Sequence, residues 1–285
     1  MMTIRGNHRA RRGAAFVLAV LITTSSAGGP LDVDTSGTEP AVAAAIHAAV
    51  VAVRVNQRQA ASWGHLGQLF HVHGMHVLAL TSYSNARRLD PRDYRWPYLA
   101  ALATPPEAAE AALALMAEAY ALRPDDYALA IGYGDLLTRL GHLTRARIVY
   151  RAARPIDPRG YADLGLARLA HAEGRVFHAR ARLFDARRKS PRNGEIHRLL
   201  AQTFHRIGDR EGARESAVRA EAFAGRLQPT SVVVDEMRSR AESVDTLWDL
   251  GSRLLARGEY ASARLAFERA RDRSKHAGSR FHRAL

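Results

Sequence analysis

Four histidines lie close together in the sequence, at His65, His71, His73 and His76. Histidine is a common metal ligand, and short His-rich tracts can bind zinc or copper. The His71-x-His73 pair straddles an expected helix end, however, and no nearby Asp or Glu completes a ligand set. The sequence also has no H-E-x-x-H motif. We therefore interpret these histidines as exposed turn residues and predict neither a metal site nor a cofactor.

Other motifs for catalysis or nucleotide binding are missing as well. Residues 132–134 (GYG) lack the third glycine and the preceding strand of a dinucleotide fingerprint, and neither a Walker loop nor a G-x-S-x-G elbow occurs. The chain has no cysteine, which excludes a thiol nucleophile and Cys-ligated zinc. Asp125-Asp126, and Asp90 with Asp93, flank expected helix starts, where carboxylates favour the helix dipole. We predict that the chain is not an enzyme.

Composition points to an all-α protein. The 285 residues are 47% hydrophobic, and the strong helix formers Ala, Leu and Arg dominate. The formal net charge is +14, and Lys189 and Lys275 are the only lysines. This charge is spread along the chain without a dense basic run, so nucleic-acid binding is allowed but not indicated.

The first residues have the pattern of a secretory signal peptide. Residues 1–27 carry four arginines, then an apolar run over 13–22, then small residues up to Ala27. About ten apolar residues are too few to span a bilayer, which takes roughly 20. We expect export to a periplasmic or extracellular location, with no membrane span in the mature chain. An uncleaved anchor and a start placed too far upstream are the alternatives.

The next segments lead into helical sequence. Residues 28–39 are polar and Gly-rich, which is typical of a linker. Residues 40–59 begin with Pro40, a residue suited to the first turn of a helix, and are rich in Ala and Val. We expect this helix to cap the apolar end of the elements that follow.

A period of about 34 residues organises the rest of the chain. Residues 60–93 show it most clearly, in the order Trp63, Leu66, Gly67, Phe70, Gly74, Ala79, Tyr83, Ala86 and Pro91. Trp63, Leu66 and Phe70 fall on one helix stripe, while Gly67 and Ala79 are small where two helices would cross. This segment resembles the tetratricopeptide repeat (TPR) at every signature position.

The pattern recurs in approximate register along the chain. The expected repeats are 60–93, 93–126, 127–160, 160–193, 194–227 and 244–277. Residues 228–243 interrupt the register, and we interpret them as an irregular helical insertion and candidate hinge. Residues 278–285 look like a C-terminal helix fragment. The resemblance implies an all-α fold, a right-handed α-solenoid of stacked helical hairpins that forms a TPR superhelix.

The resemblance also implies a concave groove lined by the first helix of each repeat. The family's groove positions fall here on Gln68, His71, Val72, Tyr94, Pro97, Thr104, Ile131, Asp135, Thr138, Arg139, Tyr161, Leu164, Arg168, His171, Glu195, Arg198, Gln202, His205, Arg206, Asp245, Trp248 and Ser252. Our strongest partner-binding candidates among them are Tyr94, Arg139, Tyr161, Arg168, His171, Arg198, Gln202, His205, Arg206 and Trp248.

Four of the candidates are arginines: Arg139, Arg168, Arg198 and Arg206. They could form a positive strip for an acidic segment or a C-terminal carboxylate, because arginine offers paired donors to carboxylates. The alternative is a set of solvated side chains. His71, His171 and His205 share one repeat position and would make binding pH-sensitive near the ordinary histidine pKa of about 6.5 if they lined the groove.

The function implied by the resemblance is that of an interaction adaptor or scaffold. Its partner would be another protein or peptide, held as an extended segment or as a helix. One alternative is a solenoid that binds a polyanion or nucleic acid through the arginine excess. The other is an accessory subunit of an exported enzyme. The sequence does not indicate an oligomeric state.

Overall fold

A computed structural model describes residues 37–223 and 231–276, together with residues 31, 33, 35 and 229. The expected signal peptide at 1–27 and the C-terminal fragment at 278–285 lie outside the described residues, and so does half of the expected linker at 28–39. All described helices belong to one compact unit that starts at Thr35. Among them, none is long and apolar enough to cross a membrane.

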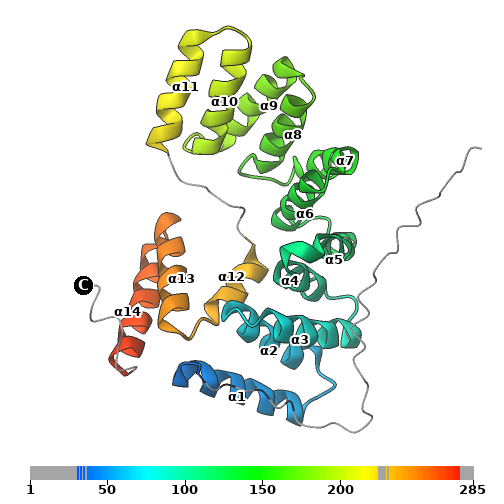
Figure 1. The fold of residues 1–285 in the computed structure, drawn as a ribbon, viewed down its shortest axis with the longest axis vertical. Helices are drawn as coiled ribbons and strands as arrows, with labels where there is room; N and C mark the ends of the chain where they lie inside the picture. The colour runs from blue at the N-terminus through cyan, green and yellow to red at the C-terminus, as the bar shows by residue number, and fades with distance from the viewer. Residues whose placement is uncertain are drawn as a thin grey trace, which may run out of the picture. The chain divides into compact units, whose positions relative to one another are not determined.

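The described part of the chain contains helices and no strands (Figure 1). The helices are α1 (Pro40–Val55), α2 (Ala60–Val72), α3 (His76–Leu89), α4 (Arg95–Ala103), the short 3-10 helix η1 (Pro106–Ala108), α5 (Ala109–Leu122), α6 (Tyr127–Arg139), α7 (Leu143–Ala153), α8 (Tyr161–Ala172), α9 (Val176–Lys189), α10 (Gly194–Arg206), α11 (Arg210–Ala222), α12 (Val232–Ser239), α13 (Val244–Ala256) and α14 (Tyr260–His276).

These helices pack as hairpins in chain order. The pairs α2–α3, α4–α5, α6–α7, α8–α9, α10–α11 and α13–α14 each pack together, and from α2 to α11 each hairpin also contacts the next one. This arrangement confirms the expected all-α solenoid of stacked helical hairpins. Helix α1 packs on α2 through a buried apolar face that includes Ile46 and Val50.

Close contact between glycines and aromatic rings holds the hairpins together. A Cβ atom on Gly67 would lie 2.7 Å from the ring of Tyr83, so the ring occupies the space that a side chain would need. Tyr150 is inserted in the same way between Gly134 and Gly165, where an added Cβ would lie 2.5 Å from its ring in each case. Both tyrosines are buried. The glycines of the repeat pattern therefore lie where a tyrosine ring from a neighbouring helix packs against the backbone.

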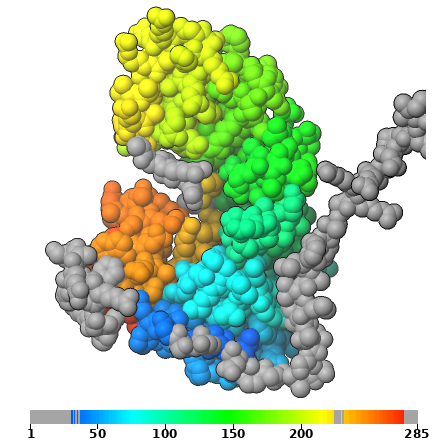
Figure 2. Space-filling model, in the orientation of Figure 1, coloured from blue at the N-terminus to red at the C-terminus, as the bar shows by residue number. Residues whose placement is uncertain are grey.

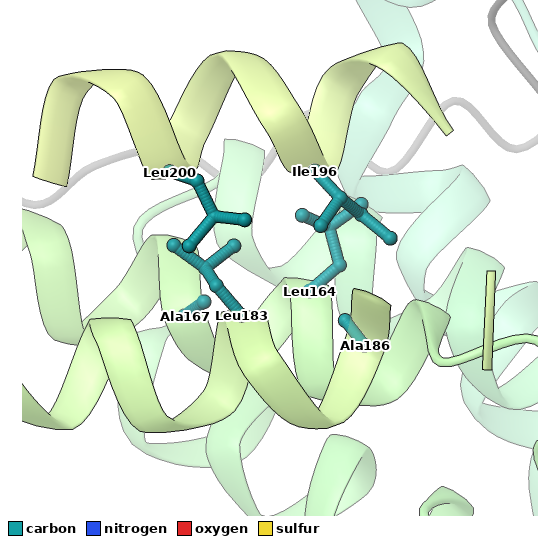
Figure 3. Close-up of a cluster of buried hydrophobic side chains, with 6 residues drawn as sticks. All are labelled: Leu164, Ala167, Leu183, Ala186, Ile196 and Leu200. Carbon is teal, nitrogen blue, oxygen red and sulfur yellow. The ribbon is translucent and has the colours of Figure 1, made fainter. Parts of the chain in front are cut away.

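Leucine, isoleucine and alanine side chains fill the interface between α8, α9 and α10 (Figure 3). The buried cluster consists of Leu164, Ala167, Leu183, Ala186, Ile196 and Leu200. Two hairpins contribute to it, so neither hairpin can bury its apolar face alone. This dependence on neighbours is the general basis of solenoid stability.

Several acidic residues accept hydrogen bonds from backbone N–H groups at helix N-termini. The Asp126 carboxylate accepts a hydrogen bond from the Leu129 backbone N–H at 3.0 Å and caps α6. The Asp93 carboxylate accepts from the Arg95 backbone N–H at 3.0 Å before α4. A capping carboxylate satisfies backbone donors that have no partner within the helix.

The chain does not continue its stack after α11. That helix buries only Ser216, and its other face carries charged residues such as Arg210 and Glu215. Helix α12 instead contacts α2 and α4. The core of the last hairpin packs against Val72 at the end of α2, and the Glu39 carboxylate accepts from the Val244 backbone N–H. The last hairpin is therefore joined to the first one.

Candidate partner-binding surface

A pocket of about 320 Å³ lies where α4, α6, α8 and α10 face the segment that carries α12. Its lining combines apolar and charged side chains. The residues are Tyr98, Leu102, Ala128, Ile131, Gly132, Asp135, Arg139, Tyr161, Leu164, Arg168, Glu195, Pro229, Ser231, Val234 and Arg238. Three of the ten predicted site residues, Arg139, Tyr161 and Arg168, thus come together in one pocket.

Arg168 is the electrostatic centre of this pocket. Its guanidinium lies 2.6 Å from a Glu195 carboxylate oxygen and 3.4 Å from an Asp135 carboxylate oxygen. The Tyr150 hydroxyl donates a hydrogen bond to the same Asp135 carboxylate at 2.6 Å. These contacts connect α6, α8 and α10. We call the surface formed by Asp135, Arg139, Arg168 and Glu195 the charged face.

The charged face differs from a simple row of arginines. Two carboxylates flank Arg168, so its charge is already compensated, whereas Arg139 is exposed. Tyr161 is buried beside them, and burial raises the pKa of its hydroxyl to about 12. The hydroxyl is therefore neutral at physiological pH. The surface offers both donors and acceptors to a partner.

The remaining predicted site residues lie outside the pocket. On α10, Arg198, Gln202 and His205 are exposed. The Arg206 guanidinium donates to the His171 backbone carbonyl oxygen at 3.2 Å and spans two hairpins. Burial, and then the charge of Arg206, lower the pKa of His171.

Tyr94 and Trp248 have local contacts of their own. The Tyr94 hydroxyl donates to the Asp126 carboxylate at 3.3 Å, and the Arg123 guanidinium lies over its ring. Tyr94 therefore joins two hairpins. Trp248, on α13, is 52% exposed and packs one side against Phe267.

Helix α12 covers the part of this surface that α2 and α4 form. The Arg240 guanidinium donates to the side-chain oxygen of Gln68 on α2. Arg95 on α4 lies 4.0 Å from the Glu236 carboxylate, and Tyr98 on α4 lines the same pocket as Ser231. We call the surface formed by Gln68, His71, Val72, Arg95 and Tyr98 the covered face.

Sequence reasoning did not assign this role to residues 228–243. The groove positions Gln68, His71 and Val72 were identified, but the contact of Gln68 with Arg240, just after α12, was not. One signal was available, because Val233, Val234 and Met237 have helical spacing, and all three are buried. Their destination could not be read from spacing, since the covered face lies more than 130 residues earlier in the chain.

The histidines near the first hairpin turn were expected to be exposed, but His65, His71 and His73 are partly buried, and only His76 of the four is exposed. The His71 Nδ1 atom lies 3.3 Å from the Tyr83 hydroxyl, and its ring is 5.6 Å from that of His76. Burial lowers the pKa of His71 to about 4, with smaller effects from His76 and Arg238. Within the described residues, no group of three His, Asp or Glu side chains is placed to hold a metal ion.

Comparison with known proteins agrees with this architecture. A family model described as tetratricopeptide repeat matches residues 107–161. No sequence among the curated proteins matches the chain. The solved structure of YrrB, "a TPR protein with an unusual peptide-binding site", is 18% identical, with a TM-score of 0.53 over 68% of this chain and 99% of that one.

Two further solved structures are similar to the chain. PilF of Pseudomonas aeruginosa is 16% identical, with a TM-score of 0.53 over 70% of this chain and 98% of that one. MamA of Desulfovibrio magneticus RS-1 is 17% identical, with a TM-score of 0.52 over 58% and 94%. At these identities the likeness concerns the fold. Together with the repeat register and the stacked hairpins, it leads to one conclusion: the chain has the fold of a tetratricopeptide-repeat solenoid, and its residues 107–161 match the tetratricopeptide repeat itself.

Proposed function

We propose that the chain is a non-catalytic adaptor or scaffold that binds another protein through the surface made by α2, α4, α6, α8 and α10. The observation that carries this proposal is the contact of α12 with α2 and α4. This surface already holds one amphipathic helix, which is the helix-in-groove mode of recognition. Stacked helical repeats in general present such extended surfaces to their partners.

The charged face is our proposed site for a polar partner segment. Arg139 and Arg198 are exposed on α6 and α10, where they could donate to carboxylates of an acidic peptide. Arg168 is held between two carboxylates and is better suited to position its neighbours than to bind alone. We further propose that binding takes place outside the cytoplasm, on the basis of the signal-like residues 1–27.

Charge reversal at the two exposed arginines tests the proposal. The variant R139E/R198E is compared with R151E/R214E, which makes the same charge change at exposed positions on α7 and α11. Both proteins and the wild type are used to capture partners from the native cell fraction by crosslinking. We expect specific partners to be lost with R139E/R198E and kept with R151E/R214E. Equal capture by all three proteins would contradict the proposed site.

The same proteins separate this proposal from polyanion binding. A polyanion-binding chain would lose affinity steeply as salt is raised, and both charge-reversal variants would weaken it equally, because each removes the same number of positive charges. An adaptor with a defined site shows a modest salt dependence and responds to R139E/R198E alone.

A further inference from the structure

Helix α12 presents one apolar face to the rest of the molecule. Val233 is 3% exposed, Val234 9%, Met237 7%, and Ala241 just after the helix 0%. Val232 is on the opposite side and is 82% exposed. In the space-filling view the α12 segment lies between α4 and α13 (Figure 2). The helix therefore docks as an amphipathic ligand would, and not as a member of a repeat.

The ion pair between α12 and α4 is of a kind that exchanges readily, whereas Asp235 of α12 accepts two hydrogen bonds, at 3.0 and 2.9 Å, from Arg257 at the end of α13. Arg95 and Glu236 are 4.0 Å apart, with side chains 37% and 40% exposed. Partly exposed ion pairs contribute little to stability. The helix has only eight residues, and an isolated helix of that length is marginal in water. A longer helix with the same apolar spacing would bury more surface on the covered face.

One group on the covered face is left without a partner by α12. The side-chain oxygen of Gln68 accepts from Arg240, but its buried Nε2 atom has no hydrogen-bond partner among the described residues. A buried donor without an acceptor costs about 1–3 kcal/mol. A ligand that offered an acceptor at this position would recover that energy, which α12 does not.

We propose that the covered face is a binding site for an amphipathic helix of a partner protein, and that α12 occupies this site in the free chain. The partner helix carries apolar residues at the α12 spacing, an arginine that reaches the Gln68 oxygen, and a side-chain acceptor for the Gln68 Nε2 group. It binds by displacing α12. This inference rests on the proposed scaffold function and names the partner class for one part of the surface.

The test uses a fluorescent peptide with the sequence of residues 229–243 as the probe. It is titrated into the full chain, into V234D/M237D, and into V232D/S239D. The first variant places two carboxylates on the buried side of α12, and the second places the same charges at exposed positions of that helix. The apparent affinity for a site is reduced by the fraction of molecules in which it is already occupied.

We expect the peptide to bind V234D/M237D at least about tenfold more tightly than it binds the wild type or V232D/S239D. Equal binding to all three proteins would show that α12 does not compete for the site. No binding to V234D/M237D, with an unchanged circular dichroism spectrum, would show that the covered face does not take a free helix. Either result overturns the inference.

Two further variants keep the result interpretable. If V234D/M237D does not fold, V234A/M237A removes the same apolar contacts without adding charge, and the same ordering of affinities is expected. R151E/R214E should bind the peptide as the wild type does, because it alters only exposed positions on α7 and α11. The loss of native partners in R139E/R198E tests the proposed function separately from the peptide result.

Discussion

The covered face and the charged face belong to the same row of helices, but the side chains on them find their partners in different parts of the chain. On the covered face, α12 supplies a buried apolar strip, an arginine for Gln68 and a carboxylate near Arg95. On the charged face, Arg168 is satisfied from within the repeats, by Asp135 and Glu195 of the neighbouring hairpins. One surface therefore depends on a distant segment of the chain, and the other depends on adjacent repeats.

This difference shows how one solenoid can hold two kinds of binding surface. Repeats stabilise each other through neighbours, so a surface completed by neighbours persists as long as the stack does. A surface completed by an inserted helix can be opened without unfolding the repeats beneath it. The two faces should therefore respond differently to the same type of substitution.

The largest expected effect tests the dependence on neighbours. Tyr150→Ala removes a ring held between Gly134 and Gly165, and large-to-small changes of buried aromatic residues cost about 3–5 kcal/mol. Hydrogen exchange monitored by mass spectrometry should become faster across α6, α7 and α8. Exchange in α12 should stay as in the wild type, because α12 docks on other helices. Faster exchange in α12 to the same extent would show that the two faces are not independent.

The next largest effect is a pH dependence of stability caused by His71 on the covered face. The pKa of folded His71 is about 4 and its ordinary value is 6.5, so the unfolded chain binds the proton more tightly. The free energy of unfolding should therefore fall as pH is lowered from about 6.5 to 4, by roughly 3 kcal/mol from this group. Urea unfolding of wild type and His71→Gln at several pH values measures the difference.

The contribution of His71 can be isolated from its neighbours. Burial also lowers the pKa of His65 and His73. The pH dependence of stability that these two groups cause is therefore present in both the wild type and the variant. Only the difference between wild type and His71→Gln belongs to His71. Parallel stability curves for the two proteins between pH 4 and 6.5 would contradict the prediction.

A smaller effect compares two equivalent tyrosines. The Tyr150 hydroxyl donates to the Asp135 carboxylate, whereas the Tyr83 hydroxyl is 3.3 Å from the His71 ring nitrogen. Hydrogen bonds to charged groups contribute about 1.5–3 kcal/mol, and neutral ones about 1 kcal/mol. Tyr150→Phe should therefore lower the urea midpoint more than Tyr83→Phe does. The reverse order would indicate that the Asp135 bond is weak.

The smallest expected effect is that of Arg168→Met, which keeps most of the apolar stem. The ion pairs of Arg168 are partly exposed, and such pairs contribute below about 1 kcal/mol. The loss should shrink further in 1 M salt, where charges are screened. A loss of several kcal/mol that does not depend on salt would show that Arg168 acts mainly through packing.

Most of the solenoid could be predicted from residue spacing. Gly67 with Tyr83, and Gly134 with Tyr150, recur at the same interval because the same helix crossing recurs. Contacts within one period of the chain leave such a trace in the sequence. The ion pairs of Arg168 with Asp135 and Glu195 were harder to predict. All three residues were identified as separate groove positions, but the distances between them depend on how the hairpins stack.

The position of α12 could not be predicted in this way. Its apolar strip is visible in the sequence, but a single inserted segment has no repeated partner that would reveal where it docks. The contact of Arg240 with Gln68 spans 172 residues, and that of Val244 with Glu39 spans 205. No period in the sequence reports a pairing that occurs once.

These two long-range contacts have a consequence for folding of the chain. Hairpins from α2 to α11 close over short distances and can form early, whereas contacts over great sequence separation form slowly and late. The covered face is therefore completed only after the repeats have formed. During that interval each folding molecule displays the site vacant, and a partner present in the same compartment would meet it before α12 does.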